Sequence, residues 1–299
     1  LKKLITNKFL DKVNYYVQRK KIRNFKPDII HRTYFDNYKT NLPTVLTVYD
    51  LIHEKFHSLY GKDSNYRPKK AAIENADQII CISKNTLNDL KYYYDLKDKK
   101  TSVIYLGSDL RYLKNKIIKK KQNTNYLLFV GKRTKYKNFD NFIKAYSLSK
   151  KLKNDFKIIC FGGGRFSSDE YKLFEENSIE RNKIENVNGS DSRLIQLYLN
   201  AKALVYPSFY EGFGLPLVEA MSLECPVICS NNSSIPEICA DAAEYFDPYN
   251  IEDITKKIAN VVYSEKRIND LKAKGIKREK NFTWAKCAQE TENIYKKLI

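Results

Sequence analysis

Short apolar runs alternate with longer polar, helix-like stretches from Pro27 to the end of the chain. The runs lie at residues 28–31, 44–49, 79–82 and 102–105, and again at 126–130, 157–161, 203–206, 225–230 and 243–248. Continuous apolar runs of this length are typical of strands buried on both faces, and helices between them allow successive strands to run parallel. The alternation therefore predicts an α/β protein built on parallel sheets.

The length of the chain and one basic segment predict two domains. A chain of 299 residues is long for a single hydrophobic core, and an apolar content of 42% is enough for two. Residues 111–125 interrupt the apolar periodicity with a lysine-rich run, which is typical of a linker. We therefore expect an N-terminal domain over residues 1–110, opening with a basic amphipathic helix at 1–26, then a linker at 111–125 and a C-terminal domain over 126–281.

Ligands of open parallel α/β sheets bind beyond the carboxyl ends of the strands. In the first domain, His31, Tyr49 and Asp50 lie at such strand ends, and His53 follows them closely. A single histidine is more often a structural residue than a catalyst. These four residues are therefore candidates for one functional edge, without an assigned role for either ring.

The stretch from residue 203 to residue 221 has the pattern of a strand, a tight loop and the start of a helix. Gly212 and Gly214 let backbone N–H groups approach a ligand, and the helix they lead into offers unpaired N–H groups to an anion. Glu211 and Glu219 flank this loop. Because carboxylates repel a bare phosphate, we expect them to accept hydrogen bonds from hydroxyls attached to it. A sugar joined to a nucleotide through a diphosphate supplies both kinds of group.

Two other loops carry residues suited to the same ligand. Arg133 and Lys137 follow the apolar run at 126–130, where a guanidinium and an ammonium can converge on one diphosphate. Gly162 and Gly163 follow the run at 157–161 and permit close backbone approach to a nucleotide. The sequence therefore predicts a nucleotide-sugar site built from three strand-end loops.

The segment EGFGLPLVEAM, at residues 211–221, resembles the retaining nucleotide-sugar glycosyltransferases of family 4, also called glycosyl transferases group 1. The segments FGGGRF (161–166), PDIIHRTYF (27–35) and TVYDLIHEKF (47–56) are similar to other parts of that family. The resemblance implies the GT-B fold, in which two Rossmann-like domains face a cleft. It also implies that the last helix, over residues 282–299, returns toward the first domain.

The same resemblance implies roles for the donor-side residues. Glu211 would hold hydroxyls of the donor sugar, Glu219 would hold the ribose, and Arg133 with Lys137 would neutralise the leaving nucleoside diphosphate in place of a metal ion. The sugar and the distal phosphate would contact the backbone of Gly212, Phe213, Gly214 and Leu215.

The implied reaction moves a hexose-type sugar from a nucleoside-diphosphate sugar to a hydroxyl of a glycan or lipid-linked acceptor, with retention at the anomeric carbon. Departure would occur on the front face, with Glu211 as a positioning group and not as a nucleophile. No Asp-x-Asp motif stands where a metal-dependent transferase needs one, so neither a metal nor a separate cofactor is expected. Polysaccharide and lipopolysaccharide biosynthesis are the processes associated with the family.

The chain departs from the family pattern in two places. Nothing in it matches the opening strand and glycine loop of the family, so we expect an incomplete N-terminal domain, and Tyr49 stands where many relatives have histidine. The acceptor-side roles implied for His31, Tyr49, Asp50 and His53 are weakened accordingly. Two alternatives stay open: a catalytically impaired nucleotide-sugar-binding subunit, and a nucleotide-sugar 2-epimerase.

The net charge of +19 favours anionic partners such as nucleoside diphosphates or an anionic membrane surface. Nucleic acid is not expected as a partner, because the lysine-rich run lacks interleaved aromatic residues. Six scattered cysteines form no CxxC pair or Cys/His cluster, which is typical of reduced thiols in the cytosol. We expect a cytoplasmic protein, with peripheral attachment to the inner face of the cytoplasmic membrane as a further option.

Overall fold

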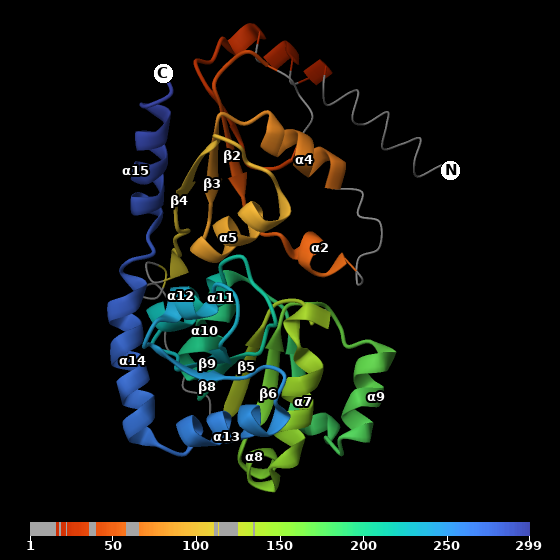
Figure 1. Cartoon of the computed structure of the whole chain (residues 1–299). Helices are drawn as coiled ribbons and strands as arrows, with labels where there is room; N and C mark the ends of the chain where they lie inside the picture. Colours follow the sequence, from red (N-terminus) through yellow and green to blue (C-terminus); the bar gives the residue numbers. More distant parts are fainter. Residues whose placement is uncertain are drawn as a thin grey trace. The chain divides into compact units, whose positions relative to one another are not determined.

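A computed structural model describes residues 16–17, 19–21, 23–35, 40–57, 66–110, 113, 125–133 and 135–299. The chain divides into two compact units, one of Leu1–Ile104 with Ala288–Ile299 and the other of Tyr105–Cys287. The expected linker at 111–125, except for residues 113 and 125, lies outside the described residues, as does the first part of the expected helix at 1–26. Both units are α/β structures (Figure 1).

The described residues of the first unit form a parallel sheet with the strand order β1-β2-β3-β4. The strands are β1 (Ile30–Arg32), β2 (Thr44–Val48), β3 (Gln78–Cys81) and β4 (Lys100–Val103). All five residues of β2 and all four of β3 are buried. These are the two inner strands, so the apolar runs predicted them well. The outer strands β1 and β4 begin two residues away from the predicted starts.

Three helices of this unit pack beside the sheet: α2 (Ile52–Lys55), α4 (Tyr66–Glu74) and α5 (Lys84–Tyr93). Ser83 caps α5, because its hydroxyl accepts the backbone N–H of Thr86 at 3.0 Å. A buried ion pair joins α4 to α2, with Lys69 Nζ 2.8 Å from Glu54 Oε2. The hydroxyl of Tyr94 donates to the other oxygen of Glu54 at 2.6 Å, so this carboxylate fixes the short helix that follows β2.

The second unit contains a parallel sheet with the strand order β10-β9-β8-β5-β6-β7 among its described residues. The strands are β5 (Tyr126–Val130), β6 (Lys157–Phe161), β7 (Ile184–Val187), β8 (Ala203–Tyr206), β9 (Val227–Ser230) and β10 (Ala243–Phe246). Only β7 was not predicted. It is an edge strand with a single buried residue, Ile184, and therefore has no continuous apolar run.

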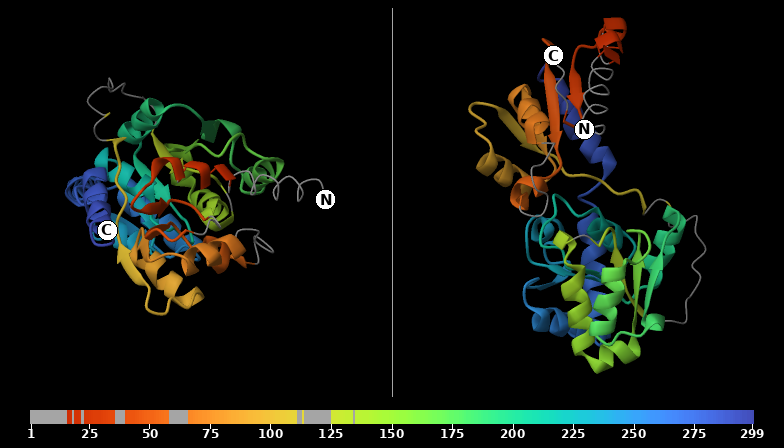
Figure 2. Two further views of the ribbon diagram at one scale, coloured as in Figure 1. Left: turned by 90° about the horizontal axis from the view of Figure 1, so that it is seen from above. Right: turned by 90° about the vertical axis from the view of Figure 1, so that its right-hand side faces the viewer.

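Helices lie on both faces of this second sheet (Figures 1 and 2). They are α7 (Phe139–Leu148), α8 (Lys150–Asp155), α9 (Ser168–Glu176), α10 (Asp191–Asn200), α11 (Leu215–Ser222), α12 (Ile235–Cys239), α13 (Ile251–Val262) and α14 (Glu265–Glu279). Where α11 meets α14, Gly275 lies against Met221, and a Cβ on Gly275 would be 3.3 Å from the Met221 side chain. Because helices cover both faces of the sheet, β5 is buried along its whole length.

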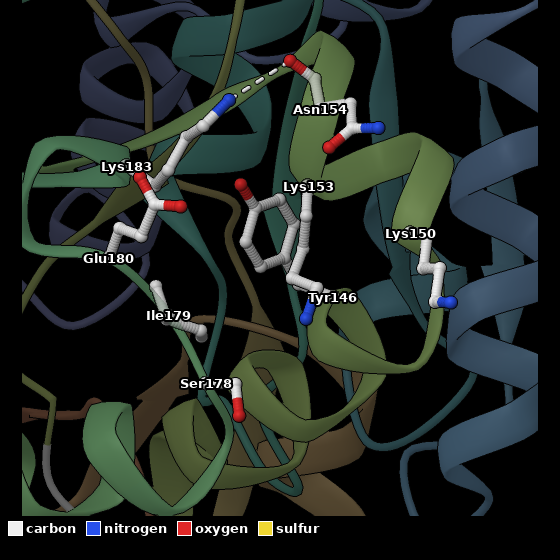
Figure 3. A pocket seen from close by; sticks show the side chains of 8 residues that line it. All are labelled: Tyr146, Lys150, Lys153, Asn154, Ser178, Ile179, Glu180 and Lys183. Carbon is white, nitrogen blue, oxygen red and sulfur yellow. Dashed lines mark hydrogen bonds between the residues drawn. The ribbon is translucent and has the colours of Figure 1, made fainter.

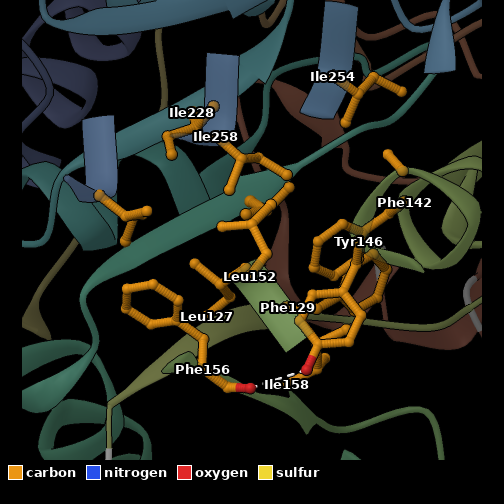
Figure 4. Close-up of a cluster of buried hydrophobic side chains, with 14 of the residues drawn as sticks. Leu127, Phe129, Phe142, Tyr146, Leu152, Phe156, Ile158, Ile228, Ile254 and Ile258 are labelled. Carbon is orange, nitrogen blue, oxygen red and sulfur yellow. Dashed lines mark hydrogen bonds between the residues drawn. The ribbon is translucent and has the colours of Figure 1, made fainter. Parts of the chain in front are cut away.

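A large apolar cluster fills the space between this sheet and the helices α7 and α13 (Figure 4). Phe129 of β5 packs edge-on against Phe139 of α7, with ring centroids 5.0 Å apart. The hydroxyl of Tyr146 is buried in the same cluster and donates to the carbonyl of Phe156 at 2.7 Å. Burial raises the pKa of Tyr146, and the nearby Glu180 carboxylate adds to this effect. The cluster anchors β5, and with it the loop that follows this strand.

The chain order of the strands reverses at β5. From β5 the chain proceeds outward to β6 and β7, and it then returns to place β8 on the opposite side of β5. In doubly wound sheets such a reversal opens a crevice at the carboxyl ends of the two central strands, because their following segments leave on opposite sides. The loops after β5 and β8 therefore occupy the position where a ligand is expected.

Candidate active site

The loops after β5 and β8 bring Lys137 and Glu211 together. Lys137 ends the short 3-10 helix η1 (Lys135–Lys137), and its Nζ lies 2.6 Å from Oε1 of Glu211. The two side chains are only 14% and 10% exposed, so the pair is held largely away from water. A buried ion pair of this kind stabilises a fold little, because both charges lose hydration. Its position at the strand reversal instead indicates a functional pair.

Tyr206, the last residue of β8, completes this group. Lys137 Nζ lies 3.4 Å from the Tyr206 hydroxyl and 5.4 Å from the centre of its ring. Burial and the neighbouring Glu211 carboxylate raise the pKa of Tyr206 well above its ordinary value. The phenol is therefore a neutral hydrogen-bonding group at any pH near neutrality.

Asn138 fixes the loop that carries Lys137. Its backbone has a φ of 56° and its side chain is almost fully buried. The side-chain amide donates to the carbonyl of Pro207 at 3.1 Å and to that of Pro248 at 2.8 Å. The backbone N–H of Phe209 also donates to the carbonyl of Tyr136 at 2.9 Å. These bonds tie the loop after β5 to the loop after β8 on either side of the ion pair.

Two serines after β9 hold the backbone of Glu211. The N–H of Glu211 donates to Ser233 Oγ at 2.9 Å, and Ser234 Oγ donates to the Glu211 carbonyl at 2.9 Å. Ser234 is fully buried and also lies 3.1 Å from the carbonyl of Phe213. The sequence alone did not mark these serines as functional residues. Their position after the apolar run at 225–230 was the available signal, since it places them on the same sheet edge.

The predicted strand, tight loop and helix start are present at residues 203–222. Gly214 has a φ of 98°, and a Cβ there would lie 2.7 Å from Leu217, so the turn into α11 requires glycine. Pro216 stands in the first turn of α11, where its missing N–H costs nothing.

Glu219 lies on α11, where the Tyr198 hydroxyl donates to it at 2.9 Å. Burial raises the pKa of Glu219, and the nearby Asp191 adds to this effect, while the bond from Tyr198 opposes it. In the described state Glu219 therefore has a phenol as its partner and no cation that would favour its charged form. Its carboxylate is available to exchange this phenol for another hydroxyl donor.

Arg133 lies in the loop after β5, but its partners are in the loop after β6. Its guanidinium donates to the carbonyls of Gly162 and Gly164, both at 3.0 Å, and to that of Arg165 at 3.2 Å. Its Nε bonds to the carboxylate of Glu170 on α9. The predicted convergence of Arg133 and Lys137 on one diphosphate thus stays a prediction, because Arg133 is engaged elsewhere.

The predicted acceptor-side residues all lie in the first unit. His31 on β1 has both ring nitrogens bonded, to the hydroxyl of Tyr295 and, at 2.8 Å, to that of Thr47. Asp50 accepts the backbone N–H of Ile52 at 3.1 Å and so caps the start of α2. These contacts give His31 and Asp50 structural partners.

Tyr49 and His53 lie beside Asp50 on the same segment. Tyr49 directly follows β2 and is 37% exposed. His53 lies on α2, the short helix that the Glu54 carboxylate fixes. These two side chains stay candidates for contact with an acceptor.

Two cavities are lined by described residues of the second unit. One of about 250 Å³ (Figure 3) is lined by Tyr146, Lys150, Lys153, Asn154, Ser178, Ile179, Glu180 and Lys183. These residues precede β6 and β7, so this cavity lies at the amino ends of the strands and is not part of the candidate site. The other, of about 450 Å³, lies between α9 and β7 and includes Arg165 and Phe166 beside the glycine turn.

Among the described residues, no three His, Cys, Asp or Glu side chains are grouped so that they could hold a metal ion. The expectation of metal independence is not tested by this observation. None of the helices in the described part of the chain is long and apolar enough to cross a membrane.

Comparison with solved structures identifies the fold class. Sucrose-phosphate synthase from Thermosynechococcus elongatus superposes with a TM-score of 0.79 over 95% of this chain and 77% of its own, at 20% identity. WaaG, a glycosyltransferase involved in lipopolysaccharide biosynthesis, gives a TM-score of 0.72 over 95% of this chain and 82% of its own, at 17% identity. At such identities the similarity shows the fold alone, and that fold is GT-B.

Sequence comparison then identifies the family. Residues 112–278 match the family described as glycosyl transferases group 1, and residues 10–112 match the one described as glycosyltransferase family 4. The first match covers more than half of the chain and includes every donor-side residue discussed above. The chain belongs to the glycosyl transferases group 1 family.

Two relatives from Escherichia coli are similar over different shares of the chain. O-antigen chain mannosyltransferase B is 34% identical over 58% of this chain and 46% of its own length. The serotype-specific mannosyltransferase WbdA is 27% identical over 93% of this chain and 38% of its own length. The chain thus spans less than half the length of these two curated relatives.

Proposed function

We propose that this chain transfers a hexose-type sugar from a nucleoside-diphosphate sugar to a hydroxyl of a glycan or lipid-linked acceptor. The observation that carries this proposal is the Lys137–Glu211 pair, which lies where the strand order reverses and beside the start of α11. Family membership and the mannosyltransferase names of two relatives support it. Mannose is accordingly the first sugar to test.

A donor would separate the ion pair. Glu211 would accept hydrogen bonds from hydroxyls of the donor sugar. The ammonium of Lys137 would contact the diphosphate to which that sugar is joined. The backbone of Gly212, Phe213, Gly214 and Leu215 would add N–H donors, and the amino end of α11 would favour negative charge there. Each charge that is paired internally in the free protein would then find a partner on the ligand.

Charge on the leaving diphosphate would be met by Lys137 and by backbone amides, which act strongly in a site that excludes water. We therefore propose a reaction that needs no metal ion. A double displacement would require a carboxylate nucleophile at the anomeric carbon. Glu211 is hydrogen-bonded and paired with a cation, which suits a positioning group better, so we propose front-face departure with retention.

Glu219 would bind the ribose by exchanging its Tyr198 partner for a ribose hydroxyl. On the acceptor side, Tyr49 and His53 are the proposed contacts, while His31 and Asp50 would support them through their structural bonds. We place the protein in the cytoplasm, with peripheral contact at anionic membrane through its basic surface. Co-flotation with vesicles that contain anionic lipid, lost at high salt, tests that contact.

The function itself is tested by product analysis. The full chain is incubated with a nucleoside-diphosphate mannose and a mannose-containing glycan or lipid-linked acceptor, with and without EDTA. Nucleoside diphosphate should be released only when acceptor is present, and NMR coupling constants of the product should match the donor's anomeric configuration. Diphosphate release without acceptor, accompanied by a changed sugar, would indicate an epimerase. Donor binding without turnover on any acceptor would indicate a binding subunit.

A further inference from the structure

We propose that Arg133 acts on the donor through the glycine turn at residues 162–164, as a positioning residue and not as a ligand of the diphosphate. This inference rests on the proposed function, since it concerns how the same site binds its nucleotide. The proposal differs from the prediction made from the sequence, in which the guanidinium of Arg133 binds the diphosphate directly.

The hydrogen-bonding capacity of Arg133 is nearly used up inside the protein. A guanidinium has five N–H groups. One of them bonds to the Glu170 carboxylate and three others to the carbonyls of Gly162, Gly164 and Arg165. The side chain is 3% exposed, and Phe166 lies over the guanidinium with its ring centre 4.7 Å away. Too few donors remain for a bidentate contact with a phosphate.

The same bonds determine which way the turn presents its amides. In a trans peptide the C=O of one residue and the N–H of the next point in opposite directions. Since the carbonyls of Gly162, Gly164 and Arg165 point at the guanidinium, the N–H groups of Gly163, Arg165 and Phe166 point away from it. No bond from these three N–H groups to another part of the described chain is found. Backbone amides that point away from the guanidinium in this way are available to donate to phosphate oxygens or hydroxyls.

The turn and the guanidinium are packed too closely to move independently. Gly162, Gly163 and Gly164 have φ values of 82°, 74° and 75°, which other residues rarely adopt. A Cβ on Gly163 would lie 2.7 Å from Arg133 Nη1 and 3.0 Å from the carbonyl of Gly131. A Cβ on Gly164 would meet nothing within 4 Å. Alanine at either position strains the backbone similarly, but only alanine at 163 displaces Arg133.

Glu170 connects this arrangement to α9. Its second oxygen accepts the N–H of Ser167 at 2.7 Å, while its own N–H donates to Ser167 Oγ, so it completes a capping box. Glutamine is equally suited to that capping position. Glu170→Gln therefore keeps the helix start and removes the negative charge beside Arg133.

Glu170→Gln distinguishes the two possible roles of Arg133, because each role predicts an opposite change in nucleotide affinity. If Arg133 bound the diphosphate, removing a competing carboxylate would leave nucleotide affinity unchanged or increase it. If Arg133 positions the turn, the weaker bond to glutamine loosens the turn and lowers affinity. Arg133→Lys adds a second comparison, because lysine keeps the charge but has only three N–H donors for the three carbonyls and the Glu170 carboxylate.

The experiment is isothermal titration of the full chain with the nucleoside diphosphate that binds the wild type, with a melting temperature for every variant. We expect Arg133→Lys and Gly163→Ala to raise the Kd about tenfold, the scale of one lost charge-assisted hydrogen bond. Glu170→Gln should raise it about threefold or more. Glu265→Gln, which removes one charge of an exposed ion pair at the start of α14, should change the Kd less than twofold.

Tighter or unchanged binding by Glu170→Gln, together with near-normal binding by Arg133→Lys, would overturn the proposal. A Kd for Gly163→Ala within twofold of the wild-type value would also overturn it, since displacing the guanidinium would then not affect the nucleotide. A wild-type chain that binds none of the nucleoside diphosphates contradicts the proposed function itself, and this inference with it. Failure of the inference alone leaves wild-type binding intact, so the two failures are distinguishable.

Discussion

Lys137 and Glu211 illustrate what single residues contribute to this account. Two opposite charges 2.6 Å apart and largely shielded from water attract strongly, but each has given up hydration to be there. The pair therefore contributes little to stability, and under the proposed function its two charges are exchanged for contacts with the donor. Substitution at either position should consequently affect function more than folding.

The first prediction concerns Glu211→Gln. Loss of the carboxylate removes a contact to the sugar in the transition state, so turnover should fall at least ~100-fold. Binding of the bare nucleoside diphosphate should be unchanged or tighter, because Lys137 is freed from its internal partner. Steady-state kinetics and isothermal titration on one preparation give both values.

A matched control for this variant is Glu265→Gln. Glu265 pairs with Lys202 at the same distance of 2.6 Å, but it is 74% exposed and lies at the start of α14. Exposed pairs of this kind contribute little. Its activity should equal that of the wild type. If both variants lost activity alike, Glu211 would have no special role.

The second prediction uses the pKa of Glu219. Burial raises that pKa above its value in the unfolded chain, so the unfolded state releases the proton first as pH rises. The folded protein is thus penalised above the folded-state pKa, and the penalty disappears as pH falls below the unfolded value near ~4.3. Glu219→Gln should therefore melt at a higher temperature than the wild type at pH 7.5, with the difference shrinking toward pH 4.

The same variant should bind the nucleoside diphosphate and its sugar less tightly, since an amide is a poorer acceptor for ribose hydroxyls than a carboxylate. A residue that serves binding at the expense of stability is expected to give this combination, in which the variant is more stable but binds the nucleotide less tightly. A melting temperature that is lower than that of the wild type at every pH would contradict this interpretation of Glu219.

At the level of elements, the loop after β9 supports the loop after β8. Ser234 is buried, and its hydroxyl donates to the carbonyl of Glu211 and lies within reach of that of Phe213, on either side of Gly212. An unpaired buried carbonyl costs about 1–3 kcal/mol. The serine therefore holds Glu211 in register with Lys137 from an element that carries neither of them.

The third prediction is that Ser234→Ala lowers turnover about tenfold by releasing the Glu211 backbone, with a melting temperature several degrees below that of the wild type. Ser208→Ala is the control, because the Ser208 hydroxyl is buried in the neighbouring loop and has no hydrogen-bond partner among the described residues. That control should retain turnover. The turnover of the two variants is measured side by side. Equal turnover would show that Ser234 does not position Glu211.

The strands that are buried along their whole length could be predicted from the sequence, and the partly exposed ones could be predicted less well. Strands such as β5 and β8 are covered on both faces and appear as unbroken apolar runs, whereas the edge strand β7 has only one buried residue and was missed. Lys137 and Glu211 were each recognised from their own motif. Their contact could not be predicted, because it depends on β8 lying next to β5.

The hydrogen-bond partners of Arg133 and Ser234 could not be predicted from the sequence either, because they also depend on which loops lie next to each other. A guanidinium after a strand can bind a ligand or a neighbouring loop, and only the three-dimensional path of residues 162–170 shows that it binds the loop. His31 was similarly undecided between a catalytic and a structural role until the position of Tyr295 was known.

At the scale of the whole molecule, the end of the chain belongs to the first unit. Residues 288–299 group with residues 1–104, and Tyr295 of α15 (Trp284–Tyr295) bonds to His31 of β1. Burial lowers the pKa of His31, which favours the neutral ring at neutral pH. This contact joins the last helix to the first strand across most of the sequence.

The fourth prediction is that Tyr295→Phe destabilises the first unit by about 1 kcal/mol, because a half-buried ring nitrogen of His31 loses its hydrogen-bond partner. Hydrogen exchange should become faster in β1 and β2 and stay unchanged in β5 and β6. The control is Tyr92→Phe, at a position where the side chain is 82% exposed. Exchange rates that match the control throughout would mean that the Tyr295–His31 contact does not hold the helix.

The claim on which the whole account depends is that Lys137 and Glu211 bind a nucleotide sugar where the strand order reverses. Thermal melting of the wild type and of Lys137→Ala, each with a series of nucleoside diphosphates and their sugars, tests it most directly. One nucleotide should stabilise the wild type, by ~2.7 kcal/mol at a hundredfold excess over its Kd, and should stabilise Lys137→Ala far less. Equal shifts in the two proteins, or no shift with any nucleotide, would contradict the account.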